Sequence, residues 1–317
     1  MRNAERKISY ANGAETGFSG IKKEFKKNGI LYLIVLPVII YYFIFHYMPL
    51  YGLLMAFEDF SPRRGITGSD WVGLTHFISF FKSADFSRIV TNTLRISLSC
   101  LLFEFPAPIV MAILINELNG KYFKRTIQTI SYLPHFISLV VICGMIKTFV
   151  EPDGIIGAVV SHMTGNGSSL LSQSNMFLPI YVVSNIWQSI GWESIIYLAA
   201  LMNVDPQLYE AADIDGAGKI AKIVKITLPS IAMTIVTMFI LRVGKIMNVG
   251  YEKIILLYNP AIFDKSDVIS SFVYRMGFTN QNWSYSAAVG LINSAVNMIL
   301  LLTTNAVSRK LTETGLW

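Results

Sequence analysis

Length and composition restrict what kind of protein this chain can be. Of its 317 residues, 53% are hydrophobic and only 15% are charged, and the mean hydropathy is +0.51. These values exclude an ordinary soluble domain and predict a membrane protein with several spans. The net charge of +6 does not indicate a nucleic-acid-binding protein, because the basic residues lie at the ends of apolar segments and in the amino-terminal tail.

Long apolar segments predict an all-α protein with six transmembrane helices. In chain order these spans are Ile30–Met48, Leu94–Leu118, Ile127–Val150, Phe177–Met202, Pro229–Val249 and Ser286–Val307. The predicted domains are a polar tail over residues 1–28, a transmembrane domain over 29–308 with its core at about 88–308, and a short tail over 309–317. Pro106 and Pro108 lie inside the second span and predict a kink, since proline lacks the N–H of a helical hydrogen bond.

The distribution of lysine and arginine predicts the orientation of the spans. Both tails, the loop near Lys124 and the loop over Lys219–Lys225 are basic, whereas the loop over Glu151–Met176 contains neither residue type. Cytoplasmic loops carry the excess of these residues. Both termini and the loop between the fourth and fifth spans are therefore predicted to be cytoplasmic.

A polar stretch between the fourth and fifth spans has the clearest local signals in the chain. Asp205 and Pro206 predict the start of a helix, because a capping carboxylate precedes proline at the first helical position. Gly216 and Gly218 then predict a sharp reversal. The helical run that follows carries a basic stripe suited to anionic membrane lipids, and Pro229 opens the fifth span.

This stretch resembles the EAA loop of the inner-membrane permease subunits of binding-protein-dependent ABC importers. The family pattern is Glu-Ala-Ala, three residues, Gly, nine residues, Ile, one residue and Leu-Pro. It is met here by Glu210, Ala211, Ala212, Gly216, Ile226, Leu228 and Pro229. An ordinary amphipathic surface helix and turn is the alternative, but chance rarely fills so long a spacing.

Further motifs resemble permeases for complex saccharides. They are Pro49-Leu50-Tyr51-Gly52, Trp71-Val72-Gly73-Leu74, Asn92-Thr93-Leu94, Asn116-Glu117-Leu118, Leu133-Pro134-His135-Phe136 and Asn248-Val249-Gly250-Tyr251-Glu252. The likeness covers about residues 25 to 310. It implies a type I ABC importer permease of the maltose-importer type, in the oligosaccharide and polysaccharide branch, located in a bacterial cell membrane.

The resemblance also implies partners and a division of labour. A second, different permease subunit completes the pathway, two ATPase subunits use ATP and Mg, and an extracytoplasmic solute-binding protein delivers the oligosaccharide. The residues implied to couple to an ATPase are Glu210, Ala211, Ala212, Asp215, Gly216, Ile226, Leu228 and Pro229. The chain has no G-x-x-x-x-G-K-[ST] and no H-E-x-x-H sequence, so we expect neither a cofactor nor a catalytic site of its own.

Polar residues in the fourth span are candidates for the substrate path. Asn185, Gln188, Ser189 and Trp192 recur at a spacing that places them on one helical face. Amides and a hydroxyl can hydrogen-bond sugar hydroxyls, and an indole offers a flat surface to the ring. The alternative is that this stripe makes polar packing contacts with neighbouring helices.

Arg242 and Lys245 in the fifth span are further candidates, because an intramembrane cation is costly unless it is paired or hydrated. Counting about 1.5 Å per residue from Pro229 places Arg242 roughly 20 Å above the cytoplasmic end. Glu104 and Glu193 are predicted to lie lower. We therefore expect an aqueous cavity or the companion permease to accommodate the two cations, and a cavity would favour an anionic saccharide such as a uronate oligomer.

Two other classes of protein could contain several spans. An ion-coupled secondary transporter should show intramembrane acidic residues and paired discontinuous helices, and only Glu104 and Glu193 meet the first condition. A structural or signalling membrane protein would leave the pattern that begins at Glu210 unexplained.

Overall fold

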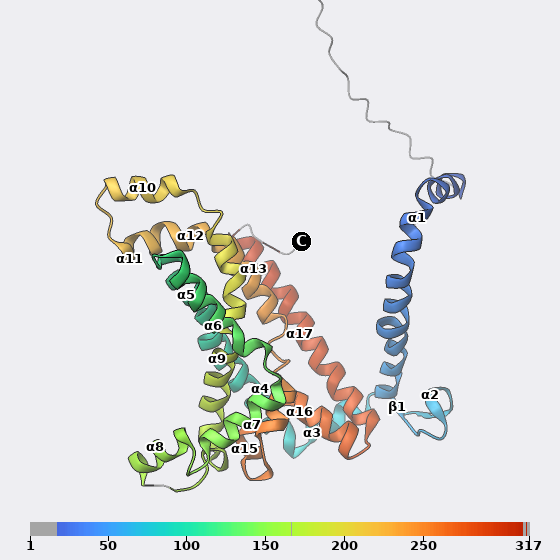
Figure 1. Ribbon diagram of the computed structural model, residues 1–317. Coiled ribbons are helices and arrows are strands. Elements are labelled where there is room, and N and C mark those ends of the chain that lie inside the picture. Colours follow the sequence, from blue (N-terminus) through green and yellow to red (C-terminus); the bar gives the residue numbers. More distant parts are fainter. Residues whose placement is uncertain (1–17, 166, 313–314, 316–317) are drawn as a thin grey trace, which may run out of the picture. The chain divides into compact units, whose positions relative to one another are not determined.

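The computed structural model describes residues 18–165, 167–312 and 315, and these residues are largely helical (Figure 1). The chain forms two units, Met1–Leu54 and Met55–Trp317. Most of the polar tail predicted over residues 1–28 lies outside the described residues, as does the end of the predicted carboxyl-terminal tail.

The first unit contains α1 (Phe18–Tyr42), which changes direction at Asn28. A π-helical turn (Phe43–Tyr47) and a 3-10 helix (Met48–Phe57) follow it in the sequence, and the 3-10 helix includes the boundary between the two units. The apolar side chains from Ile30 onward are exposed. An exposed, continuous apolar helix of this length is typical of a membrane span.

The second unit begins with a small antiparallel pair of strands, in which Glu58 is paired with Trp71. Its first elements are β1 (Glu58–Asp59), α2 (Gly65–Gly68), β2 (Asp70–Trp71), α3 (Thr75–Lys82), α4 (Ala84–Ser99), α5 (Pro106–Glu117), α6 (Lys121–Tyr132), α7 (Leu139–Val150) and α8 (Ile155–Thr164). The remaining elements are α9 (Ser174–Leu201), α10 (Pro206–Ile214), α11 (Lys219–Lys222), α12 (Leu228–Ser230), α13 (Ala232–Val243), α14 (Tyr251–Leu257), α15 (Phe263–Ser266), α16 (Ile269–Tyr274) and α17 (Trp283–Thr312).

Three helices among the described residues are long and apolar enough to cross a membrane, namely Asn28–Phe57, Ala84–Glu117 and Trp283–Lys310. The number rises to as many as five if each of two bent helix pairs is counted as one span. Helix α9, the predicted fourth span, has 28 residues but is not among them. Its polar residues lower its hydropathy, so the count of six spans stays a prediction.

Two predicted spans are wrong as continuous helices. The predicted third span breaks between α6 and α7, whose helical segments differ in direction by 98°. Pro134 lies in a 3-10 turn at this break, where its missing N–H interrupts the helical hydrogen bonds. The predicted fifth span bends by 64° near Ile231, and α13 ends at Val243. An apolar window does not reveal such breaks, because it averages hydropathy along the sequence and contains no information on the direction of the backbone.

The kink predicted from Pro106 is a π-helical turn in the structure and does not break the helix. A π-helical turn (Cys100–Glu104) joins α4 to α5, and Pro106 occupies the first turn of α5. Proline is tolerated at that position, and the wider π-turn absorbs the irregularity.

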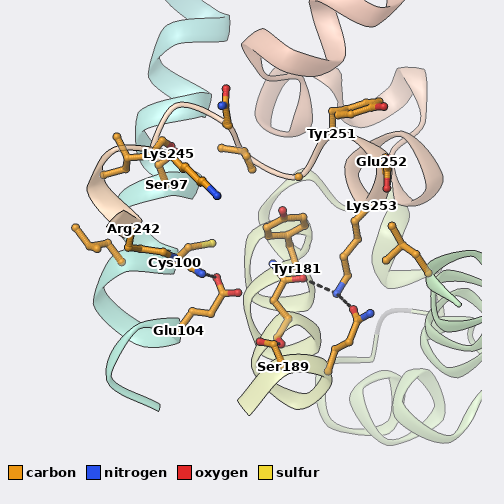
Figure 2. Close-up of a pocket in the computed structure, with 18 residues that line it drawn as sticks. Ser97, Cys100, Glu104, Tyr181, Ser189, Arg242, Lys245, Tyr251, Glu252 and Lys253 are labelled. Atoms are coloured by element: carbon orange, nitrogen blue, oxygen red, sulfur yellow. Dashed lines mark hydrogen bonds and ion pairs between the residues drawn. The ribbon is translucent and has the colours of Figure 1, made fainter. Parts of the chain in front are cut away.

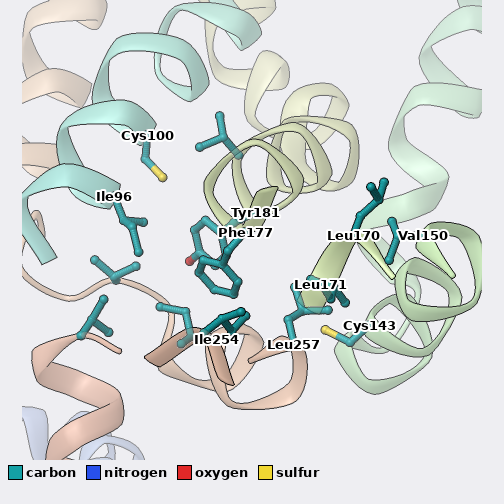
Figure 3. Packing of buried hydrophobic residues seen from close by; sticks show 14 residues of the cluster. Ile96, Cys100, Cys143, Val150, Leu170, Leu171, Phe177, Tyr181, Ile254 and Leu257 are labelled. Carbon is teal, nitrogen blue, oxygen red and sulfur yellow. The ribbon is translucent and has the colours of Figure 1, made fainter. Parts of the chain in front are cut away.

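Helix α9 is the common packing partner in the second unit. Near its start, Phe177 and Tyr181 belong to a buried cluster that also contains Ile254 and Leu257 of α14 (Figure 3). Near its end, Leu198 and Leu201 pack against α5. The two cysteines, Cys100 and Cys143, are free thiols buried in the first of these clusters.

The two ends of the second unit are formed by different helices. Helices α10 to α12 lie at one end together with the carboxyl-terminal end of α17, whereas α8, α15 and α16 lie at the opposite end (Figure 1). The loop that contains Glu210 (α10 to α12) and the carboxyl-terminal end of α17 therefore lie at the same end of the second unit. The distribution of lysine and arginine predicts that both are on the same side of the membrane.

Candidate functional site

A polar cavity of about 450 Å³ lies between α4, α9 and the segment that joins α13 to α14 (Figure 2). It brings together most of the predicted substrate-path residues, namely Asn185, Gln188, Ser189, Arg242 and Lys245. Trp192 is the exception. It lines a neighbouring cavity of about 660 Å³, and Arg242 and Lys245 line both cavities.

An irregular segment between Val243 and Tyr251 forms one wall of the polar cavity. Within a membrane, irregular backbone needs partners from the surrounding protein. Side chains of three helices supply them: Ser97 donates to the Ile246 carbonyl, Asn297 accepts from the Met247 N–H at 3.0 Å, and Ser270 donates to the Val249 carbonyl at 2.9 Å. The break in the fifth helix is thus held in place by hydrogen bonds.

Arg242 is paired with carboxylates, so the prediction that Glu104 and Glu193 lie too low for this role was wrong. The guanidinium lies 2.7 Å from Glu104 Oε2 and 3.6 Å from Glu193 Oε1. Counting about 1.5 Å per residue back from Glu117 places Glu104 roughly 20 Å from the end of its helix rather than close to that end. The bend near Ile231 also invalidates a straight count along the fifth span.

Lys245 differs from Arg242 in its exposure and in its partners. Its side chain is exposed at the edge of both cavities. Among the described residues no carboxylate lies within ion-pairing distance of it, so its charge is available to a ligand.

Lys253 lines the same cavity and was missed in the sequence. It is only 4% exposed, and its amine donates to Asn185 Oδ1 at 2.6 Å and, more weakly, to Gln188 Oε1 at 3.5 Å. The amine also lies 5.8 Å from the centre of the Tyr181 ring. Burial lowers the pKa of Lys253 to about 8. The residue lies beyond the predicted fifth span, and only the apolar run after it hinted at burial.

The rest of the predicted polar stripe makes structural contacts. Ser189 donates its hydroxyl to the Asn185 carbonyl one turn earlier, at 2.8 Å. The indole of Trp192 stacks on the His135 ring with 4.6 Å between ring centres and packs edge-on against Phe136. In this structure Trp192 therefore contacts protein rings from the break between α6 and α7.

The loop with the EAA pattern folds as its local sequence predicts. Asp205 caps α10 by accepting from the Gln207 N–H at 2.9 Å, and Pro206 occupies the first turn. The helix ends at Ile214, and Gly216 adopts a left-handed φ of +74°. Only glycine takes this conformation without steric cost.

The two arms of this loop are tied together, and its outer surface is exposed. Lys222 forms an ion pair with Asp213, and the Tyr209 hydroxyl lies 3.0 Å from the Thr227 hydroxyl. Large apolar side chains nevertheless face outward, with Leu208 48%, Ile214 88% and Ile220 78% exposed. A cluster of exposed apolar residues on a braced loop is typical of a protein-docking surface.

These features define the transmembrane component of a solute transporter. Long apolar helices carry a polar cavity at a helix break, and an exposed, braced loop lies at one end. Comparison with known proteins is more specific. Residues 104–313 match the family described as binding-protein-dependent transport system inner membrane component, and the chain belongs to this family. The predicted resemblance to importer permeases is confirmed.

Similar proteins cover nearly the whole chain. Protein LplB of Bacillus subtilis (strain 168) is 41% identical over 293 residues, which are 92% of each chain. The polygalacturonan/rhamnogalacturonan transport system permease protein YteP of the same organism is 39% identical over 288 residues, 90% of each chain. A crystal structure of a bacterial ABC transporter involved in the import of the acidic polysaccharide alginate matches with a TM-score of 0.85 and 41% identity, over 92% of this chain and 99% of that one.

A second solved structure shows an assembly. It is the bacterial alginate ABC transporter in complex with its alginate pentasaccharide-bound periplasmic protein, and its matching chain gives the same TM-score and identity. Together these matches identify a type I ABC permease fold for this chain. The family consists of transporter permeases rather than of enzymes.

Proposed function

We propose that the chain is one of two permease subunits of an ATP-driven importer, and that its cargo is an acidic oligosaccharide or polysaccharide fragment. The observation that carries this proposal is the polar cavity, in which Lys245 and Lys253 have no carboxylate partner among the described residues. The names of two relatives support the acidic cargo, since one carries polygalacturonan or rhamnogalacturonan and the other takes part in alginate import.

The cavity has suitable chemistry for such a cargo. Its volume falls within the range of about 300–1,000 Å³ found for ligand sites. Amides from Asn185 and Gln188 can hydrogen-bond sugar hydroxyls, and the unpaired amine of Lys245 can bind a carboxylate. A neutral sugar would leave that charge without a partner, which favours a uronate-type substrate over a neutral one.

The energy for uptake is supplied by other chains. We infer that α10 to α12 dock on one of two ATPase subunits, which bind ATP and Mg, through Glu210, Ala211 and the exposed apolar side chains of the loop. This places the loop and both termini in the cytoplasm, and a solute-binding protein on the opposite side of the bacterial membrane. Gly216 and Pro229 then fix how the loop joins the fifth helix.

The substrate proposal is tested with the complete importer in liposomes. ATP hydrolysis is measured with the solute-binding protein loaded with tetragalacturonate or, as a neutral control of the same length, maltotetraose. We expect stimulation by the acidic oligosaccharide. Stimulation by maltotetraose alone would refute the acidic cargo, and no dependence on the loaded binding protein would refute the importer assignment.

The docking proposal has a separate test. Glu210→Lys combined with Gly216→Pro should abolish uptake, because it reverses a charge and removes the conformation that Gly216 supplies. The amount of the subunit in the membrane should be unchanged. If the double variant still coupled ATP hydrolysis to uptake, the loop would not be the coupling element.

A further inference from the structure

The basic side chains that line the polar cavity differ in whether a carboxylate neutralises their charge. Arg242 has two carboxylate partners, whereas Lys253, with 4% of its surface exposed, has only amide oxygens. Taking an ammonium group out of water is costly unless a charged partner compensates it. Amide dipoles compensate less than a carboxylate does. Of these two cations, Lys253 is therefore the one whose charge is less well neutralised by the protein.

The groups that face Lys253 include no free carboxylate that could neutralise its charge. Facing it from the packed elements are Tyr181 of α9, Cys143 of α7, and Cys100 and Glu104 of the turn between α4 and α5. Glu104 is the one carboxylate among these, and it is engaged by Arg242 at 2.7 Å. The exposed side chains of Lys245 and Glu252 line the cavity as well.

We propose that Lys253 is a specificity-determining residue that binds a carboxylate of the transported oligosaccharide inside the cavity. The side chain of Lys253 extends from α14 and lies near Tyr181 of α9 (Figure 2), and its amine donates to Asn185 of α9. Asn185 and Gln188 hold the amine in position without neutralising it, so its charge stays available to an incoming carboxylate. This inference rests on the proposed uptake of an acidic oligosaccharide and adds the residue that selects for its charge.

A structural role is the competing explanation, since the same hydrogen bond joins α14 to α9. Lys265 provides a matched control, because its amine also donates to an asparagine, Asn175, but at the surface and outside the cavity. Lys253→Met keeps the length of the side chain and removes the buried charge, so we expect the variant to fold. Lys253→Arg keeps the charge.

The experiment is equilibrium dialysis of the purified importer complex, without its binding protein, against labelled tetragalacturonate and its fully methyl-esterified form. The ester has the same backbone without the charges. We expect wild type and Lys265→Met to bind the acid more tightly than the ester. Lys253→Met should lose at least about tenfold in affinity for the acid and nothing for the ester, since one charge-assisted hydrogen bond contributes that much. Lys253→Arg should retain the preference for the acid.

Two different failures are distinguishable. If wild type prefers the acid and Lys253→Met shows the same preference, or loses affinity for acid and ester alike, Lys253 has a structural role and this inference is wrong. If wild type binds the acid no more tightly than the ester, the acidic cargo of the proposed function is wrong, and the role of Lys253 falls with it.

Discussion

The pairing of Arg242 with Glu104 gives a prediction whose size follows from the structure. The two groups are 2.7 Å apart, and the Glu104 side chain is 9% exposed. Removing one partner of a buried pair leaves an uncompensated charge, which costs about 3–5 kcal/mol. Because the Arg242 side chain is 33% exposed, we expect Arg242→Met to destabilise the subunit by about 3 kcal/mol, the lower end of that range.

Two further variants turn this estimate into a test of the pairing. Glu193 is 35% exposed and 3.6 Å from the guanidinium, so Glu193→Gln should cost less than about 1 kcal/mol. Glu104→Gln combined with Arg242→Met removes both buried charges. The double variant should therefore be more stable than Arg242→Met alone, by about 1–3 kcal/mol.

Thermal unfolding of the assembled, detergent-solubilised complex gives the order of stabilities. The expected order is wild type and Glu193→Gln highest, the double variant next, and Arg242→Met lowest. Additive losses in the double variant would show that Glu104 and Arg242 do not compensate each other. An Arg242→Met variant as stable as wild type would show that Glu104 is not desolvated in the assembled importer.

Three other predictions follow from local geometry. Gly191→Ala should prevent α6 from packing on α9, because a Cβ there would lie 2.1 Å from the Ser131 carbonyl oxygen; the yield of folded complex measures this. Gly216→Ala should cost about 1–2 kcal/mol at its φ of +74°, whereas Gly218→Ala, at −68° and equally unobstructed, should not; thermal unfolding of both variants checks the difference. Burial lowers the pKa of Lys253 from 10.5 to about 8, so the folded state binds fewer protons between these values and thermal stability should rise with pH across that window; a wild-type curve as flat as that of Lys253→Met would contradict it.

The parts of the fold that depend on local chemistry were predictable. Asp205 and Pro206 start α10, and Gly216 ends it, because capping and left-handed conformations depend on a few adjacent residues. The helical spacing of Asn185 and Gln188 likewise placed both on the face that lines the cavity. Such predictions need no knowledge of which helices pack together.

The parts that depend on packing between distant segments were not predictable. The ion pair of Arg242 with Glu104 joins α13 to the turn between α4 and α5, and its height depends on a bend that an apolar window does not show. The burial of Lys253 depends on α14 packing against α7 and α9. Neither contact leaves a periodic pattern in the sequence, so sequence analysis identified Arg242 but misjudged its surroundings, and it missed Lys253.

Arg242 lies on the stretch of chain that leads from the proposed ATPase-docking loop to the cavities. The arm of the loop that contains Gly216 continues through α11 and α12 directly into the bend near Ile231, and α13 beyond the bend carries Arg242 in its last turn. Arg242 lines both cavities and is paired with Glu104 of the turn between α4 and α5. A displacement of the loop by an ATPase would therefore act on α13 against an ion pair anchored elsewhere. Because packed elements shift between discrete arrangements rather than deforming continuously, such a force would move a residue that lines the same cavity in which Lys253 is proposed to bind the substrate.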